Sequence, residues 1–225
     1  NYGDDVLIGG AGNDTLDGGG DNDTYVYNLG DGLDTIYDNA GSNKIIFGEG
    51  IAQNNLSFTQ IDNNLLIYLN GDKDQGIIIE SFFSSDSCKI GEIHFADNSV
   101  FYLSETGLTL DQSDRNDDMT INGTDYDDTI IGGSGNDTIN AGDDDDVITG
   151  GKGNDTLNGG YGRDTYIYNL GDGIDTISET RGNDKIKFGT GIALDDLKFT
   201  QEGNDLRITI NDDCLLYTSD AADEA

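Results

Sequence analysis

Proline and tryptophan are absent from this chain of 225 residues, and cysteine and basic residues are scarce. The only cysteines are Cys88 and Cys214, too few for a disulfide-stabilised scaffold. Only 11 Lys and Arg residues stand against 45 Asp and Glu residues, which gives a net charge of −34. This balance excludes nucleic acid as a partner, since proteins bind phosphates by neutralising them with Lys and Arg. No stretch approaches the roughly 20 apolar residues of a membrane span, so we expect none.

The same acidity raises the question of how the chain folds. Like charges in a compact chain repel one another and destabilise the folded state. Acidic chains with few aromatic residues are often disordered, but this one has 11 tyrosines and 8 phenylalanines, and its apolar residues recur at regular intervals. We therefore expect a protein that folds once counter-ions neutralise its carboxylates.

Two internal periods organise the sequence, a short one of nine residues and a long one of 141. The long period maps Asp14 onto Asp155, and Thr24 to Gly32 onto Thr165 to Gly173. The match continues to Leu65 and its counterpart Leu206, which predicts a tandem duplication of one module. The chain begins partway through a repeat, so we interpret it as a fragment.

The last residues break the duplicated pattern. Residues 214–225 have no relation to the rest of the chain, and they resemble the in-frame translation of a widely used transposon sequencing adapter. We interpret them as an artefact, which leaves Cys88 as the only genuine cysteine. The alternative is a natural C-terminal helix.

The short period has the pattern G-G-x-G-x-D-x-U-x, where U is a large apolar residue. Glycines accept positive φ and allow close approach of neighbouring chain segments, so the first six residues predict a tight turn. The last three predict a short strand whose U side chain points inward. Two such repeats complete one coil of a parallel solenoid, and several must stack to bury enough apolar surface. The repeats are Gly123 to Ile131, Gly132 to Asn140, Ala141 to Thr149, Gly150 to Asn158 and Gly159 to Ile167, with three more before residue 27.

The sixth position of each repeat is an aspartate at the end of the turn. In a stack of strands about 4.8 Å apart, aspartates from repeats i and i+2 would face each other. Such a row suits a hard cation that takes six to eight oxygens at about 2.3–2.6 Å, with turn carbonyls supplying the rest. We therefore predict several Ca²⁺ ions. The predicted aspartate ligands are Asp5, Asp14, Asp23, Asp128, Asp137, Asp146, Asp155 and Asp164.

Eight repeats in this register closely resemble the repeats-in-toxin (RTX) family, also called haemolysin-type calcium-binding repeats. The segment from Asn28 to Ile36 and the strands after it resemble the haemolysin-type calcium-binding related domain. The resemblance implies a right-handed parallel β-roll in which the sixth-position aspartates and the glycine-turn carbonyls bind calcium between alternate repeats. It implies the pairs Asp128–Asp146, Asp146–Asp164, Asp137–Asp155 and Asp5–Asp23. The turn residues it implies are Gly9, Gly10, Gly12, Gly132, Gly133, Gly135, Gly150, Gly151, Gly153, Gly159, Gly160 and Gly162.

Some repeats depart from the pattern, which weakens individual sites. The departures are Asp21, Thr124, Tyr126 and the Asp143-Asp144 pair, all in glycine-rich turns. Beyond each block, degenerate repeats continue the register. They carry Asp34 and Asn43 in the first copy, and Asp175 and Asp184 in the second. We expect them to extend the roll, and calcium binding there is left open.

The rest of each module alternates apolar and polar residues, which predicts half-buried strands that cap the roll. The expected domains are a first β-roll block at 1–46, a β-rich related domain and linker at 47–122, and a second β-roll block at 123–187. A second β-rich segment begins at 188–213, and the interpreted artefact follows at 214–225. The fold class is all-β.

No catalytic constellation is present. The single histidine, His94, lies in a predicted strand without a Ser, Cys or second His partner, so we interpret it as structural. We expect a non-catalytic calcium-binding module. The RTX resemblance implies an exported bacterial protein that passes through a type I secretion apparatus and folds on calcium outside the cell. Two alternatives stay open: the C-terminal part of a secreted enzyme or toxin (protease, lipase, glycosidase or haemolysin), and the spacer of a surface adhesin.

Overall fold

The computed structural model describes residues 2–84, 90–179, 181–210 and 214–220. Almost every regular element is a β-strand, and the two 3-10 turns, η1 (Gln53–Asn55) and η2 (Leu194–Asp196), are three residues each. The chain divides into unit 1, Asn1–Thr106, and unit 2, Gly107–Ala225. Within the residues described, neither helical turn has the length and apolar character that a membrane span requires.

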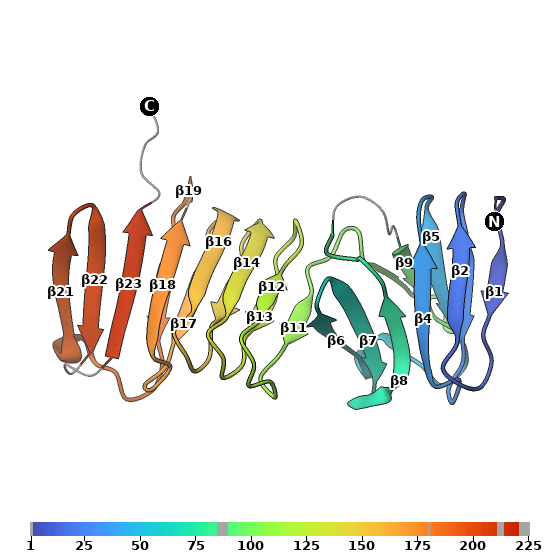
Figure 1. Cartoon of the computed structure of the whole chain (residues 1–225), viewed down its shortest axis with the longest axis horizontal. Coiled ribbons are helices and arrows are strands. Elements are labelled where there is room, and N and C mark those ends of the chain that lie inside the picture. The colour runs from blue at the N-terminus through green and yellow to red at the C-terminus, as the bar shows by residue number, and fades with distance from the viewer. Residues whose placement is uncertain (1, 85–89, 180, 211–213, 221–225) are drawn as a thin grey trace. The chain divides into compact units, whose positions relative to one another are not determined.

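Unit 1 begins with a β-roll in which successive strands alternate between two parallel sheets (Figure 1). In the first sheet, Leu7 of β1 lies opposite Tyr25 of β3, and Tyr25 lies opposite Ile45 of β5. In the second, Leu16 of β2 lies opposite Ile36 of β4. The strands are β1 (Val6–Ile8), β2 (Thr15–Gly19), β3 (Thr24–Tyr27), β4 (Leu33–Asp38) and β5 (Asn43–Phe47).

The β-rich segment of unit 1 continues both sheets of the roll. Strand β8 pairs with β4 in parallel and with β7 antiparallel, while β9 pairs with β5 in parallel. The turn before β7 contains Asp62, and the turn before β10 contains Asn98, both at positive φ. The segment therefore covers the open strands β4 and β5, as the sequence predicts for a cap. Its strands are β6 (Leu56–Ile61), β7 (Asn64–Leu69), β8 (Asp72–Ile79), β9 (Ile90–His94) and β10 (Val100–Tyr102).

Unit 2 contains the longer roll, again with two parallel sheets. One sheet has the order β11-β13-β15-β17-β20, and the other begins β12-β14-β16-β18. Two strands, β11 and β12, precede Gly123, so the roll includes strands that the nonapeptide register does not mark. The strands are β11 (Thr109–Asp111), β12 (Thr120–Asn122), β13 (Thr129–Ile131), β14 (Thr138–Asp143), β15 (Val147–Thr149), β16 (Thr156–Gly162), β17 (Thr165–Tyr168), β18 (Ile174–Glu179), β19 (Arg181–Gly182) and β20 (Lys185–Phe188).

The end of unit 2 repeats the arrangement of unit 1 in backbone terms. The hairpin β21 (Leu197–Glu202) and β22 (Asp205–Ile210) matches β6 and β7. Strand β23 (Cys214–Asp220) pairs in parallel with β18 and antiparallel with β22, the position that β8 has in unit 1. Residues 214–220 therefore form a strand and not the C-terminal helix of the alternative, and residues 221–225 lie outside the described residues.

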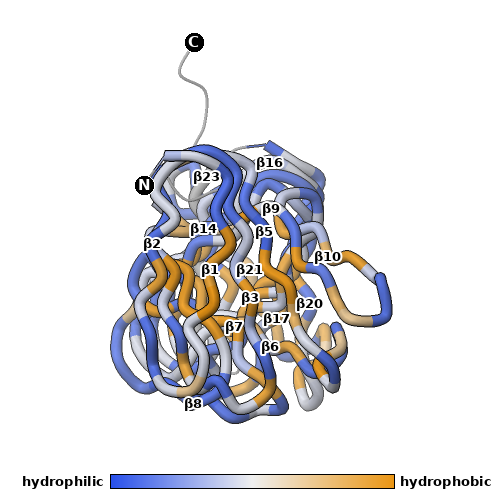
Figure 2. Tube along the Cα trace, turned by 90° about the vertical axis from the view of Figure 1, so that its right-hand side faces the viewer, coloured by the Kyte–Doolittle hydropathy of each residue, from blue (hydrophilic) through white to orange (hydrophobic). Residues whose placement is uncertain are grey.

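The core of each roll is a stack of the apolar residues at the eighth repeat position. In unit 2, Ile130, Ile139 and Ile148 are fully buried, and Leu157 and Tyr166 are each 2% exposed. The strands carry the hydrophobic residues and the turns between them are hydrophilic (Figure 2). One large side chain per strand gives a thin core, so the turns have to hold the coils together as well. The expectation of an all-β parallel β-roll with capping strands is confirmed.

Candidate metal centre

The sixth-position aspartates of unit 2 form two continuous rows along the edges of the roll. In the long ladder (Asp128, Asp146, Asp164 and Asp184), each backbone amide donates a hydrogen bond to Oδ1 of the aspartate in the next coil, over 2.7, 2.9 and 2.9 Å. In the short ladder (Asp137, Asp155 and Asp175), the same bonds measure 2.8 and 3.1 Å. The structure thus brings together the three pairs expected in unit 2.

Unit 1 has the same arrangement over fewer coils. The amide of Asp5 donates to Asp23 over 2.8 Å, and the amide of Asp14 donates to Asp34 over 3.0 Å. The next step differs, because the amide of Asp23 donates to the side-chain oxygen of Asn43. An amide replaces the carboxylate at this point of the row, so unit 1 stacks fewer negative charges.

The second carboxylate oxygen of many ladder aspartates is buried without a hydrogen-bond donor. Among the described residues, this holds for Oδ2 of Asp14, Asp23, Asp34, Asp146, Asp155 and Asp164. A buried acceptor left without a donor costs roughly 1–3 kcal/mol, and more when it is charged. The simplest ligand for a row of such oxygens is a cation. The ligand atoms available to such a cation are all oxygens, which fits Ca²⁺.

Burial raises the pKa of several of these carboxyls. The pKa of Asp146 rises to about 8, first because of burial and then because of the neighbouring charges of Asp128 and Asp164. Burial likewise raises the pKa of Asp155 to about 6, with a smaller contribution from the charges of Asp137 and Asp172. Burial raises the pKa of Asp175 to about 7, with a smaller contribution from the charges of Asp155 and Asp172. Without a cation, the ionised form of these buried carboxyls is therefore destabilised, and a bound divalent ion would stabilise it.

The glycines of the turns allow the coils to approach this closely. A Cβ at Gly151 would overlap the carbonyl oxygen of Gly133 one coil earlier, and a Cβ at Gly153 would overlap that of Gly135. Gly151 and Gly153 also have φ of 103° and 135°, which other residues rarely adopt. The role of the turn carbonyls as calcium ligands stays a prediction.

The repeats that depart from the glycine pattern adapt in different ways. Asp21 and Asp144, at glycine positions, adopt φ of 73° and 69°. Thr124 instead uses its amide and its hydroxyl to donate hydrogen bonds to Asp128, the hydroxyl lying 3.1 Å from Oδ2. The carboxylate of Asp128 is thus partly satisfied by its own turn, and the weaker calcium site expected there stays a prediction.

A second row of side chains was not predicted. At the fifth repeat position, Asp or Asn accepts a hydrogen bond from the backbone amide two repeats later, as Asp118 does from Asn136 and Asn136 does from Asn154. This row runs in the opposite sense to the aspartate ladders, so adjacent residues tie each coil to both neighbours. The signal was present in the sequence as the recurrence of Asn or Asp before most sixth-position aspartates, with Arg163 before Asp164 among the exceptions.

The single histidine, His94, is paired with a carboxylate of its own strand. The Nε2 atom of His94 lies 2.6 Å from Oε2 of Glu92, a pair on the same strand. Cys88 lies outside the described residues, and side chains are not described for Cys214 and the residues after it.

Comparison with known families agrees with this geometry. The RTX calcium-binding nonapeptide repeat matches in four copies, at residues 1–33, 26–51, 120–148 and 140–177. The haemolysin-type calcium-binding related domain matches residues 64–104. The chain belongs to the RTX calcium-binding repeat family. Repeats of this RTX family are typically non-enzymatic.

This RTX chain is similar to parts of two known proteins. It is 38% identical over 97 residues to the iron-regulated protein FrpA of Neisseria meningitidis serogroup C, which is 40% of this chain and 9% of that protein. The crystal structure of the extracellular lipase LipA from Serratia marcescens is similar with a TM-score of 0.39 and 20% identity, over 97% of this chain and 38% of that one. The RTX chain thus spans well under half of both proteins.

Proposed function

We propose that this chain is a calcium-dependent folding module of an exported bacterial protein. Its aspartate ladders would bind several Ca²⁺ ions through the sixth-position carboxylates and the glycine-turn carbonyls. The observation that carries the proposal is the set of buried Oδ2 atoms without a donor, repeated along both edges of the roll. A single atom of this kind could be an accident of packing, whereas a row at a fixed repeat position is a built feature.

Calcium binding would supply much of the folding free energy. The binding oxygens of Asp128 and Asp146 come from separate coils, 18 residues apart, so the unfolded chain has no preformed site. Binding energy then becomes folding energy. Extracellular calcium modules commonly have dissociation constants of about 10⁻⁴–10⁻³ M, so such a chain would stay unfolded at cytosolic calcium and fold outside the cell. A type I secretion apparatus, which handles unfolded chains, is the partner that this behaviour suits.

The module itself would have no catalytic activity. Its carboxylates lie in rows that repeat with the coils, and the one described histidine is paired with Glu92 on its own strand. The purified chain should therefore not hydrolyse ester, peptide or glycoside substrates. Turnover that survives purification and is lost on mutating one defined residue would contradict this part of the proposal.

A calcium titration followed by circular dichroism and small-angle scattering tests the folding proposal. We expect an expanded chain with little β-structure in chelator, which compacts cooperatively at millimolar Ca²⁺. Mg²⁺ should replace Ca²⁺ poorly, because it needs near-ideal octahedral geometry and gives up its water reluctantly. A chain that is fully folded in chelator and unchanged by calcium would overturn the proposal.

A further inference from the structure

Two departures from the nonapeptide pattern meet at the last coils of the unit 2 roll. Tyr166 occupies the eighth position of its repeat, where the neighbouring repeats have Ile or Leu. Glu179 occupies the first position of a later repeat, where most other repeats have glycine. The hydroxyl of Tyr166 donates a hydrogen bond to Oε1 of Glu179 and accepts one from the amide of Gly159 over 2.7 Å. The two departures are therefore one structural feature.

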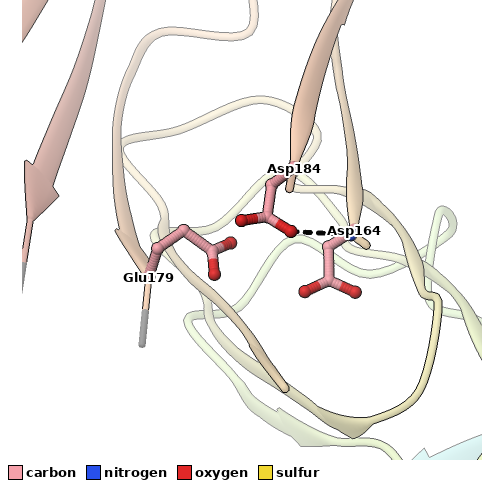
Figure 3. A group of neighbouring side chains, drawn as sticks. All are labelled: Asp164, Glu179 and Asp184. Atoms are coloured by element: carbon pink, nitrogen blue, oxygen red, sulfur yellow. Dashed lines mark hydrogen bonds between the residues drawn. The ribbon is translucent and has the colours of Figure 1, made fainter. Parts of the chain in front are cut away.

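This feature places a third carboxylate beside the last pair of the long ladder. Asp164, Glu179 and Asp184 each offer an oxygen atom, and these atoms all lie within 4.8 Å of one another (Figure 3). Two oxygens that share one calcium ion at about 2.3–2.6 Å can be separated by up to about 5 Å. A single ion can therefore contact all three side chains without movement of the backbone.

The innermost of these side chains lacks a donor for one oxygen. Asp164 is fully buried, its Oδ2 is among the buried oxygens without a hydrogen-bond donor, and its amide is engaged with Asp184. A Cβ at Gly159 would overlap that Oδ2, so glycine keeps the space beside the oxygen open. A buried carboxylate that lies beside two other carboxylates is strongly destabilised unless a positive charge compensates it.

Tyr166 acts as the positioning residue of the cluster. Its hydroxyl accepts a hydrogen bond from the amide of Gly159 and donates one to Glu179, so its position is fixed from both sides. The hydroxyl holds one oxygen of Glu179, which orients the carboxylate with respect to Asp164.

Unit 1 provides a natural comparison for this cluster. The counterparts of Asp164, Glu179 and Asp184 after a shift of 141 are Asp23, Asp38 and Asn43. Tyr25 donates to Asp38 over 2.5 Å, as Tyr166 does to Glu179. The tyrosine–acid pair is thus duplicated, but the carboxyamide of Asn43 leaves only two carboxylates.

We propose that Asp164, Glu179 and Asp184 form a three-carboxylate calcium site, in which Glu179 joins the last sixth-position pair of the long ladder, and that this site is the tightest in the chain. The inference rests on the proposed calcium-binding function, and it adds a first-position glutamate as a ligand. Three charged ligands raise the affinity of a calcium site above that of two. The site lies where the regular repeats end, so it would fix the last coil against fraying.

Calorimetric titration of the full chain with Ca²⁺ tests the site through matched variants. Glu179→Gln keeps an acceptor for Tyr166 but removes the charge, and it should weaken the tightest binding step about tenfold or more. The matched change in unit 1, Asp38→Asn, should alter that step by less than about twofold. Asn43→Asp should add a second tight step, because it gives unit 1 the third carboxylate.

A second variant, Asp184→Asn, keeps the site testable if Glu179→Gln fails to fold. Asp184→Asn reproduces the amide that unit 1 already carries at Asn43, keeps the acceptor for the amide of Asp164, and should also abolish the tight step. The site is refuted if Glu179→Gln and Asp184→Asn both bind the first calcium equivalent as the wild type does, while overall calcium-induced folding persists. No calcium uptake by the wild type would instead refute the proposed function.

Terbium gives a spectroscopic readout of the same site. The chain has no tryptophan, so tyrosines alone sensitise the luminescence of bound Tb³⁺. Tyr166→Phe should lower the emission of the first equivalent several-fold, whereas Tyr25→Phe should leave it nearly unchanged. Equal emission from both variants would contradict the assignment.

Discussion

The two units share one architecture but differ in how much negative charge they stack. The long ladder of unit 2 has four carboxylates in successive coils, whereas the corresponding row of unit 1 runs Asp5, Asp23 and then Asn43. Both rows use the same amide-to-Oδ1 hydrogen bond, which an asparagine oxygen accepts as well as a carboxylate does. The backbone geometry of the roll therefore needs only an acceptor at the sixth position, and the charge serves another purpose.

This difference separates a structural role from a binding role at one position of the repeat. If charge served the fold alone, the buried carboxylates of unit 2 would be a cost that asparagine could avoid. Their retention is explained by a cation. Unit 2 should accordingly bind more calcium, and depend on it more, than unit 1.

The largest expected effect comes from removing a carboxylate in the middle of the long ladder. Asp146 lies between Asp128 and Asp164, whereas Asp137 has one carboxylate neighbour, Asp155, and the amide of Met119 on its other side. Asp146→Ala should raise the calcium midpoint of folding about tenfold and Asp137→Ala about threefold, since 1.4 kcal/mol corresponds to a factor of ten. Circular dichroism during a calcium titration measures both, and equal midpoints would contradict the pairing.

The pH dependence of the calcium-free state is the next largest expected effect. The folded-state pKa of Asp146, about 8, lies above the ordinary value of 3.8, so the folded chain binds more protons than the unfolded chain between those pH values. Its stability should thus be highest near pH 4 and fall as pH rises towards 8. In calcium-depleted buffer, the folded fraction should decrease from pH 5 to pH 8, and Asp146→Asn should flatten this slope. With calcium present, the apparent affinity should instead increase over the same interval, because binding displaces the proton.

A smaller effect on the calcium midpoint is expected when a substitution restores glycine at a turn position of the repeat pattern. Thr124 donates two hydrogen bonds to Asp128 that compete with a cation for the same carboxylate. Thr124→Gly should lower the calcium midpoint about twofold to threefold, given the tuning of calcium affinity by its ligands. Thr129→Gly, at a strand position, is the control and should raise the midpoint. A higher midpoint for Thr124→Gly would show that the threonine stabilises the turn more than it blocks the ion.

The smallest expected effect concerns the last strand, β23, which is the counterpart of β8 in unit 1. The two strands have corresponding backbone pairings but unrelated sequences. Within the part of the chain that the structure describes, the ladders end at Asp184, so truncation after Asp213 should leave the calcium midpoint unchanged. The interpretation of residues 214–225 as an artefact predicts an unchanged melting temperature too. A loss of several degrees would mean that the backbone pairing of β23 stabilises unit 2.

Much of this structure could be predicted from the sequence because the repeat encodes it locally. The glycine turns, the buried eighth-position residues and the facing sixth-position aspartates all follow from nine-residue spacing. The hairpin strands β6 and β7 also follow from alternation around the Asp62 turn.

Other features depend on contacts that the repeat spacing does not express. Strands β11 and β12 join the roll without glycine-rich turns of the repeat pattern before them, and only their pairing with β13 and β14 identifies them. The role of Glu179 could not be predicted from the sequence for a related reason. It contacts Tyr166, which is 13 residues away on another strand, and this separation is not a multiple of the nine-residue period.

The most direct test of the account is hydrogen–deuterium exchange of the ladder amides with and without calcium. The amides of Asp128, Asp146 and Asp164 each donate to a carboxylate that is proposed to bind the ion. In chelator these amides should exchange as fast as those of an unfolded chain. At millimolar Ca²⁺ they should be protected at least about 100-fold, which corresponds to roughly 2.7 kcal/mol. Equal protection in chelator and in calcium would contradict the central claim that calcium holds the ladders together.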